Sequence, residues 1–184
     1  LFEDILSHVR DWQICASLDG TEQIGEYIRT GLAYEQFCRN FEHGLRYATN
    51  PRQMRLDFTL TLPGMFETGA MEKLSQTYGV QLLAKVIFSF SPDIIMSPLA
   101  LPRSILDPWI DELAGRSAGD MRDVLLQLKN RQTFEEQWPD TYRAGIAKGK
   151  ARVLQLESIR TQSITMAEIL AQRPAVLEWW NQIA

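Results

Sequence analysis

Cysteine and histidine are scarce in this chain, whose 184 residues include only two of each. Cys15 and Cys38 lie in apolar stretches without a partner at metal-ligand spacing, which predicts buried thiols and neither a disulfide framework nor a metal site made by this chain alone. Surplus positive charge is also missing, since 23 acidic residues face 19 basic ones. The net charge of −4 argues against nonspecific nucleic-acid binding, which requires a basic surface.

Long apolar runs are absent as well. No stretch approaches the roughly 20 residues that a membrane helix requires, and no signal segment opens the chain. We therefore expect no membrane partner and a cytoplasmic location. Helical spacing of apolar residues begins at Phe2 with no capping residue ahead of it, and residue 1 is leucine. This start leads us to expect an N-terminal part of the same protein before Leu1.

Three segments carry the alternation of apolar and polar residues that is typical of strands. They lie near residues 12–18, 54–62 and 82–90, with helical patterns between them. This order favours a parallel sheet with crossover helices, although an antiparallel sheet with one wet face would show the same alternation. The apolar row of each strand is expected to pack under the helices. In the third strand that row is Ala84, Val86, Phe88 and Phe90.

The character of the sequence changes after the third strand. A proline-rich stretch leads into a segment in which every pattern is helical, so we divide the chain into residues 1–103 and a helical C-terminal extension, 104–184. Thr165 and Glu168 have capping-box spacing, and Pro174 suits the first position of the last helix. We expect Trp179 and Trp180 to cap the core or dock this tail.

Small polar residues gather near the C-terminal ends of the strands, where parallel α/β proteins bind their ligands. Ser17, Asp19 and Thr61 fall on that side, and Arg29 lies in the loop region that follows. A guanidinium group suits a carboxylate or phosphate, and hydroxyls can bind a ribose or orient a substrate. Taken alone, Asp19-Gly20 would indicate only a turn, and a single arginine only a solvated side chain. Together they predict that Ser17, Arg29 and Thr61 project toward one common concavity.

One stretch carries a family resemblance. Residues 15–41 read CASLDGTEQIGEYIRTGLAYEQFCRNF, with SLDG ending a strand and EYIR opening the next loop. This stretch resembles the fourth strand and following helix of radical S-adenosylmethionine (radical SAM) enzymes, above all members with a twitch or SPASM type extension. LDFTLTLPG and LLAKVIFSFSPDIIMSPLALP resemble the fifth and sixth strands. The resemblance covers residues 1–113.

The resemblance implies an α/β fold that is the C-terminal part of a partial (β/α)6 TIM-like barrel. In such enzymes S-adenosylmethionine lies across the strand ends, and a 4Fe-4S cluster cleaves it to a 5'-deoxyadenosyl radical that abstracts hydrogen from a substrate. The substrate here would be an unknown small molecule or peptide.

The resemblance also assigns a cofactor role to six residues of this chain. Ser17 and Asp19 belong to the SLDG motif, and Ser17 would contact the methionine or ribose part. Arg29 would hold the methionine carboxylate. The nucleoside or substrate side would be met by Thr59 or Thr61, and the loop after Ile94 would contact the adenine.

The departure from the family is large. The CxxxCxxC motif that ligates the cluster is absent, and the tail lacks the cysteines of auxiliary clusters. The resemblance therefore implies the C-terminal segment of a longer enzyme, catalytically silent alone. The alternative is a non-catalytic α/β scaffold whose tryptophan-bearing tail docks a peptide or partner domain.

Overall fold

Three parallel strands form one sheet in the order in which they occur in the chain. The computed structural model describes residues 2–161 and 164–184. Its strands are β1 (Ile14–Ser17), β2 (Met54–Leu60) and β3 (Gln81–Val86), with β2 in the centre. Ser17 is in register with Asp57, which in turn is in register with Leu83. The parallel prediction is confirmed, and the antiparallel alternative is wrong.

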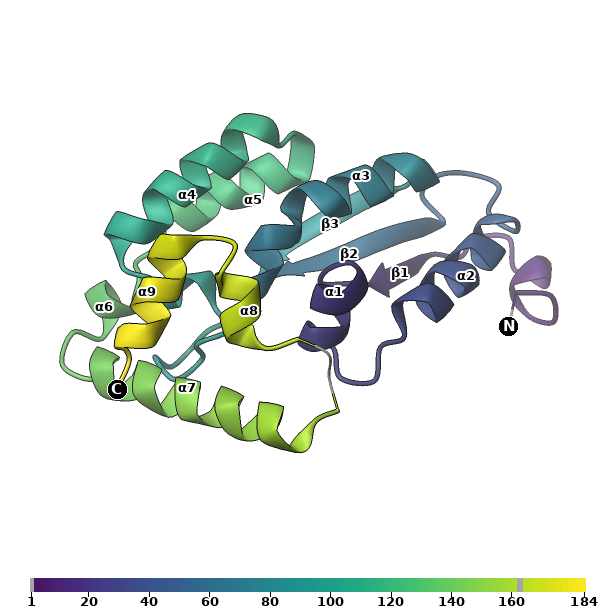
Figure 1. Cartoon of the computed structure of the whole chain (residues 1–184). Coiled ribbons are helices and arrows are strands. Elements are labelled where there is room, and N and C mark those ends of the chain that lie inside the picture. Colours follow the sequence, from purple (N-terminus) through teal and green to yellow (C-terminus); the bar gives the residue numbers. More distant parts are fainter. Residues whose placement is uncertain (1, 162–163) are drawn as a thin grey trace.

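The connections between the strands are helical and cover one face of the sheet. Helices α1 (Glu22–Ile28) and α2 (Tyr34–Leu45) join β1 to β2. The 3-10 helix η2 (Pro63–Glu67) and α3 (Thr68–Tyr78) join β2 to β3. Figure 1 shows α1, α2 and α3 on the same side of the sheet. The alternation in β2 explains this, since Leu56, Phe58 and Leu60 face these helices and are fully buried.

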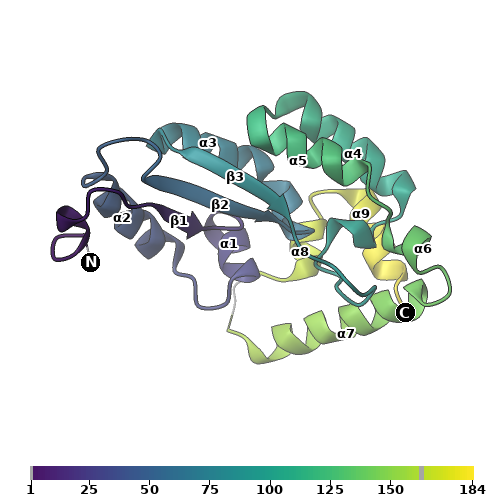
Figure 2. The same cartoon turned by 180° about the vertical axis from the view of Figure 1, so that it is seen from behind.

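No helix of the described part of the chain covers the opposite face of the sheet. In Figure 2 this face is turned to the viewer, and α1 to α3 lie behind it. It carries the polar rows of the strands, because residues in register point to the same side of a sheet. Cys15, Gln81 and Lys85 are exposed there, while Ser17 and Thr59 are half-buried. A parallel sheet with one bare polar face is unusual, since both faces are normally covered.

The third strand is shorter than the alternation predicts. The last backbone hydrogen bond between β2 and β3 runs from Ile87 N–H to Leu60 O. The backbone N–H of Leu62, just after β2, donates to Met96 O and is therefore not available to extend β3. With no ladder partner left, the chain leaves the sheet. Phe88 and Phe90 are therefore 80% and 72% exposed, and the prediction that they continue the buried row is wrong.

The N-terminal segment also differs from its prediction. The helical spacing that begins at Phe2 yields only η1 (Leu6–His8), a single 3-10 turn. So short an amphipathic segment does not hold an α-helix without tertiary packing. Phe2 instead stacks on Tyr47 at the C-terminal end of α2.

Every regular element after β3 in the described part of the chain is helical. The elements are η3 (Pro98–Ala100), α4 (Arg103–Arg116), α5 (Gly119–Lys129), α6 (Phe134–Gln137), α7 (Tyr142–Ile159), α8 (Met166–Leu170) and α9 (Pro174–Gln182). Helix α5 runs alongside β3, and α8 contacts η2. Trp179 and Trp180 are buried in the core that both parts share, as predicted. None of these described helices is long and apolar enough to cross a membrane.

Two glycines bring α7 against the loop that leaves β3. A Cβ atom at Gly149 would lie 2.6 Å from Asp93 O, and one at Gly145 would lie 2.6 Å from Pro92 Cγ. Lys148 adds an ion pair to Asp93 at 3.0 Å. Glycine weakens a helix, but here its missing side chain is what permits the contact. The tail is thus fastened at the C-terminal edge of the sheet.

Candidate functional site

Asp19 is the central residue at the C-terminal ends of β1 and β2. Its side chain is only 6% exposed. One carboxylate oxygen, Oδ1, accepts the backbone N–H of Thr59 at 2.8 Å, while Oδ2 lies 2.8 Å from Nε of Arg29. A buried carboxylate requires such partners to offset its lost hydration. Asp19 therefore ties β2 to the end of α1 and positions Arg29.

Arg29 caps the C-terminal end of α1, and among the described residues its side chain pairs only with Asp19. The contact is ionic, because the Nε–H bond is not aligned for a hydrogen bond with the carboxylate. The side chain is 38% exposed, and its two terminal amino groups have no partner among the described residues. A guanidinium group in this state is prepared for a carboxylate or phosphate, which it can bind with two parallel hydrogen bonds.

The Asp19-Gly20 turn packs closely against α1. A Cβ atom at Gly25 of α1 would lie 2.3 Å from Gly20 O. The buried Glu67 of η2 accepts hydrogen bonds from both the backbone N–H and the hydroxyl of Thr21, each at 2.6 Å. Glu67 was not predicted as a site residue; its signal in the sequence is a carboxylate directly before α3. These contacts hold the turn rigidly against α1.

The bare face supplies the remaining polar groups. The hydroxyls of Ser17 and Thr59 make no hydrogen bond to described residues, and Nε of Arg55 is buried without a hydrogen-bond partner. Lys85 pairs with Asp57 at 2.7 Å. Arg55 and Lys85 were not predicted as site residues, although both stand in the polar rows of their strands. The face thus presents two free hydroxyls, the guanidinium group of Arg55 and the ion pair of Lys85 with Asp57.

Thr61 serves the structure instead of the site. It is 3% exposed, and its Oγ1 accepts the backbone N–H of Gly64 at 3.0 Å, which closes the turn into η2. This hydroxyl is therefore not available to a ligand beside Ser17 and Arg29. The sequence could not separate Thr59 from Thr61, because both follow the same period.

Ile94 lies in the loop that folds back from β3. It is half-buried; its N–H donates to Ser91 O and its C=O accepts from Ser97 N–H. Met96 in the same loop joins the end of β2 through its bond from Leu62. The exposed rings of Phe88 and Phe90 stand 5.8 Å apart at the start of this loop. Phe88 and Phe90 thus form an exposed apolar pair just after β3, and Ile94 lies in the loop that follows them.

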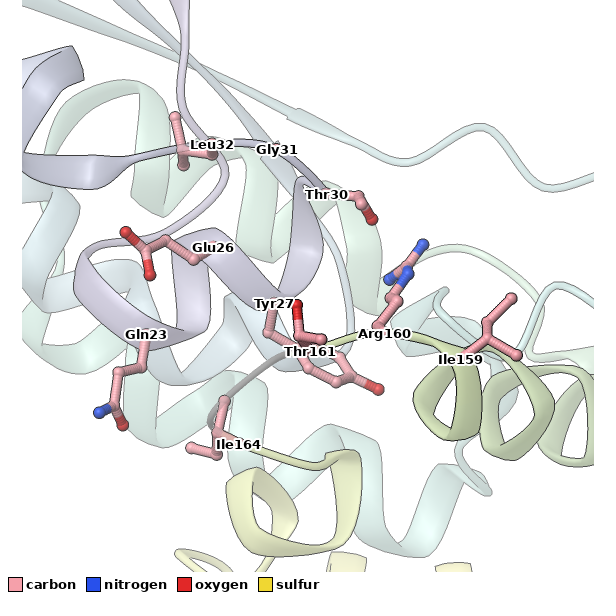
Figure 3. Close-up of a pocket in the computed structure, with 10 residues that line it drawn as sticks. All are labelled: Gln23, Glu26, Tyr27, Thr30, Gly31, Leu32, Ile159, Arg160, Thr161 and Ile164. Carbon is pink, nitrogen blue, oxygen red and sulfur yellow. The ribbon is translucent and has the colours of Figure 1, made fainter.

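A cavity of about 430 Å³ adjoins the loop that begins after Arg29. Figure 3 shows its lining: Gln23, Glu26, Tyr27, Thr30, Gly31, Leu32, Ile159, Arg160, Thr161 and Ile164. None of the six predicted site residues lines it. The cavity lies between α1 and the end of α7, which are some 130 positions apart in the chain. One hydrogen bond joins the two helices, from the hydroxyl of Tyr27 to Glu157 at 2.7 Å. Burial, together with this bond, raises the pKa of Tyr27.

The cysteines do not fit an iron-sulfur cluster. Cys15 is exposed on the bare face and Cys38 is half-buried on α2, so neither is the buried thiol that was predicted. Among the described residues no three His, Cys, Asp or Glu side chains come together as metal ligands. A 4Fe-4S cluster needs at least three thiolates from its protein in this family. This chain cannot provide them.

Comparisons of the chain with known protein families, with curated proteins and with solved structures found no match.

Proposed function

We propose that the chain is the C-terminal segment of a radical SAM enzyme and that it binds S-adenosylmethionine at the C-terminal ends of its strands. On this proposal β1, β2 and β3 are the last three strands of a partial (β/α)6 barrel, and the bare face is the barrel interior. The protein would work in the cytoplasm on a small-molecule or peptide substrate.

The observation that carries the proposal is the bare polar face of a parallel sheet whose strands run in sequential order. A doubly wound sheet would have helices on both faces, whereas a barrel segment has them only on the outside. The outer edge of β1 has no strand beside it in the described part of the chain. Both features are expected of a barrel segment, whose inner face lines the barrel interior and whose first strand pairs with the strand before it.

The residues at the strand ends fit S-adenosylmethionine. Arg29, oriented by Asp19, would hold the methionine carboxylate through its free amino groups. Ser17 and Thr59 would offer hydroxyls to the ribose and amino acid parts, and Ile94 with its loop would meet the adenine. When bound, S-adenosylmethionine would supply the radical chemistry for hydrogen abstraction from the substrate. Cluster ligands would come from an N-terminal part of the same protein.

The experiment is anaerobic reconstitution of the complete gene product with iron and sulfide. We expect 5'-deoxyadenosine to form from S-adenosylmethionine, and none to form with the 184-residue chain alone. Arg29→Gln should lower the yield at least tenfold, because charged hydrogen bonds contribute about 1.5–3 kcal/mol. Arg39→Gln is the matched control, since Arg39 is an exposed arginine of α2 paired only with neighbours on its own helix. A complete product without a CxxxCxxC motif would end the proposal.

The alternative function, a non-catalytic scaffold with a docking tail, has weaker support. Its anchors would be Trp179 and Trp180, but these are 7% and 2% exposed and belong to the core. The exposed Phe88 and Phe90 could anchor a partner instead. A double Phe88→Ser, Phe90→Ser variant separates the two functions, because a scaffold would lose its partner and an enzyme would retain Arg29-dependent activity.

A further inference from the structure

The cavity between α1 and the end of α7 is distinct from the strand-end site. Its volume of about 430 Å³ lies within the range of small-ligand pockets. It shares no residue with the six assigned to the cofactor, so its use does not depend on the proposed function.

Arg160 is the cationic group of this cavity. It is half-buried at the C-terminal end of α7 and has no ion-pair or hydrogen-bond partner among the described residues. Figure 3 shows its guanidinium group rising beside Thr30 on one side of the cavity, while Glu26 stands on the other side of Tyr27. Three of the six other arginines of the tail form ion pairs, namely Arg116, Arg152 and Arg173. An unpaired guanidinium over a cavity is suited to an anionic group.

The remaining walls limit the kind of anion. Leu32, Ile159 and Ile164 make part of the lining apolar, and Ile159 is 74% exposed. Glu26 contributes a carboxylate, of which one oxygen accepts the backbone N–H of Tyr34 at 2.9 Å. The lining therefore has no net formal charge, which disfavours a dianion such as phosphate. A single negative charge with an apolar body matches these walls.

We propose that this cavity binds a small monoanionic carboxylate with an apolar body, held at its carboxylate by Arg160 and at its body by Leu32, Ile159 and Ile164. Thr30 lines the same cavity, and its hydroxyl is a further hydrogen-bond donor available to the occupant. The occupant would join α1, which leads into Arg29, to the helical tail.

The test is a titration of the 184-residue chain with 4-phenylbutyrate, followed through the backbone amide signals of Gly31, Leu32 and Ile159. We expect saturable shifts at these three amides. The uncharged 4-phenylbutanamide should bind at least tenfold more weakly, and Arg160→Gln should weaken 4-phenylbutyrate binding by a similar factor. Arg152→Gln, an exposed arginine on the same helix, is the control and should leave binding unchanged.

Two further arms make the result decisive. Ile159→Ser removes an exposed apolar side chain without disturbing the core, and it should weaken 4-phenylbutyrate severalfold while leaving weak acetate binding intact. Inorganic phosphate should not compete. Absence of saturable shifts, equal binding by Arg160→Gln, or phosphate binding as tight as that of 4-phenylbutyrate would each overturn the assignment. Failure here would leave the Arg29 experiment unaffected.

Discussion

The helical tail and the bare face of the sheet use their polar residues in opposite ways. In the tail, Arg103 pairs with Glu136, Arg173 pairs with Glu112 at 2.7 Å, and Lys150 donates to the last carbonyls of α9. Each of these contacts closes a helix end or joins two helices. These polar groups of the tail are explained by its fold.

On the bare face many polar groups have no such task. The hydroxyls of Ser17 and Thr59 and the Nε of Arg55 lack protein partners in the described part of the chain. Polar groups that stabilise a fold are normally hydrogen-bonded within it, so these unpaired groups are not needed for the stability of the fold. Unpaired polar groups are the ones available to a ligand. The proposed cofactor site therefore lies at the strand ends, and in the tail only Arg160 belongs to a proposed site.

The largest loss of stability is expected on substitution of Asp19, which both stabilises the fold and positions a residue of the candidate site. Asp19→Ala removes the partner of both Thr59 N–H and Arg29, so the free energy of unfolding should fall by about 2–4 kcal/mol. Urea denaturation measures it. Asp111→Ala, which breaks the exposed pair with Lys129, should cost less than about 1 kcal/mol. Equal costs would show that Asp19 is not the junction described.

The next largest effect concerns the contact between α7 and the loop after β3. Gly149→Ala should lower stability by about 1–3 kcal/mol, because its Cβ would meet Asp93 O at 2.6 Å. Gly69→Ala in α3 meets no atom within 4 Å and should raise stability by up to about 1 kcal/mol. Thermal unfolding of both variants gives the comparison. A stabilised Gly149→Ala protein would mean that the tail does not pack there.

A smaller contrast compares the two regions directly. Thr133 is fully buried and caps α6, so Thr133→Ala should cost about 1 kcal/mol. Ser17→Ala and Thr59→Val on the bare face should each change stability by less than about 0.5 kcal/mol. In the complete protein the same two variants should weaken S-adenosylmethionine binding. Large stability losses from them would place these hydroxyls in the fold and not in a site.

The smallest effect is a pH dependence of the tail. The hydrogen bond from Arg103, with a further one from the backbone of Thr133, lowers the pKa of Glu136 to about 2. Because the folded-state pKa is below the unfolded one, this stabilisation is complete above about pH 4.5 and is lost as the pH falls toward 2. Glu136 is partly exposed, so the loss should stay below about 1 kcal/mol. Glu136→Gln should remove this part of the acid dependence of unfolding.

Local signals in the sequence predicted local structure well. The alternation in β2 and the capping box of Thr165 and Glu168 depend on neighbouring residues, and the structure confirms both. The end of β3 could not be predicted, because it is decided by the bond between Leu62 and Met96.

The candidate site, too, could be predicted from the sequence only in its local features. The polar rows located Ser17, Asp19, Arg29 and Thr59 near the strand ends, whereas the role of Thr61 depends on a turn that follows it. The cavity at Arg160 joins residues about 130 positions apart, and no local pattern indicates such a contact. Long-range pairing is thus what the sequence left undetermined.

The most direct test of the central claim compares S-adenosylmethionine with its decarboxylated analogue in binding to the complete protein. The account predicts that the wild-type protein prefers S-adenosylmethionine by tenfold or more, and that Arg29→Gln binds the two equally, because the group that recognises the carboxylate is gone. Arg39→Gln should keep the wild-type preference. An undiminished preference in Arg29→Gln would contradict the account.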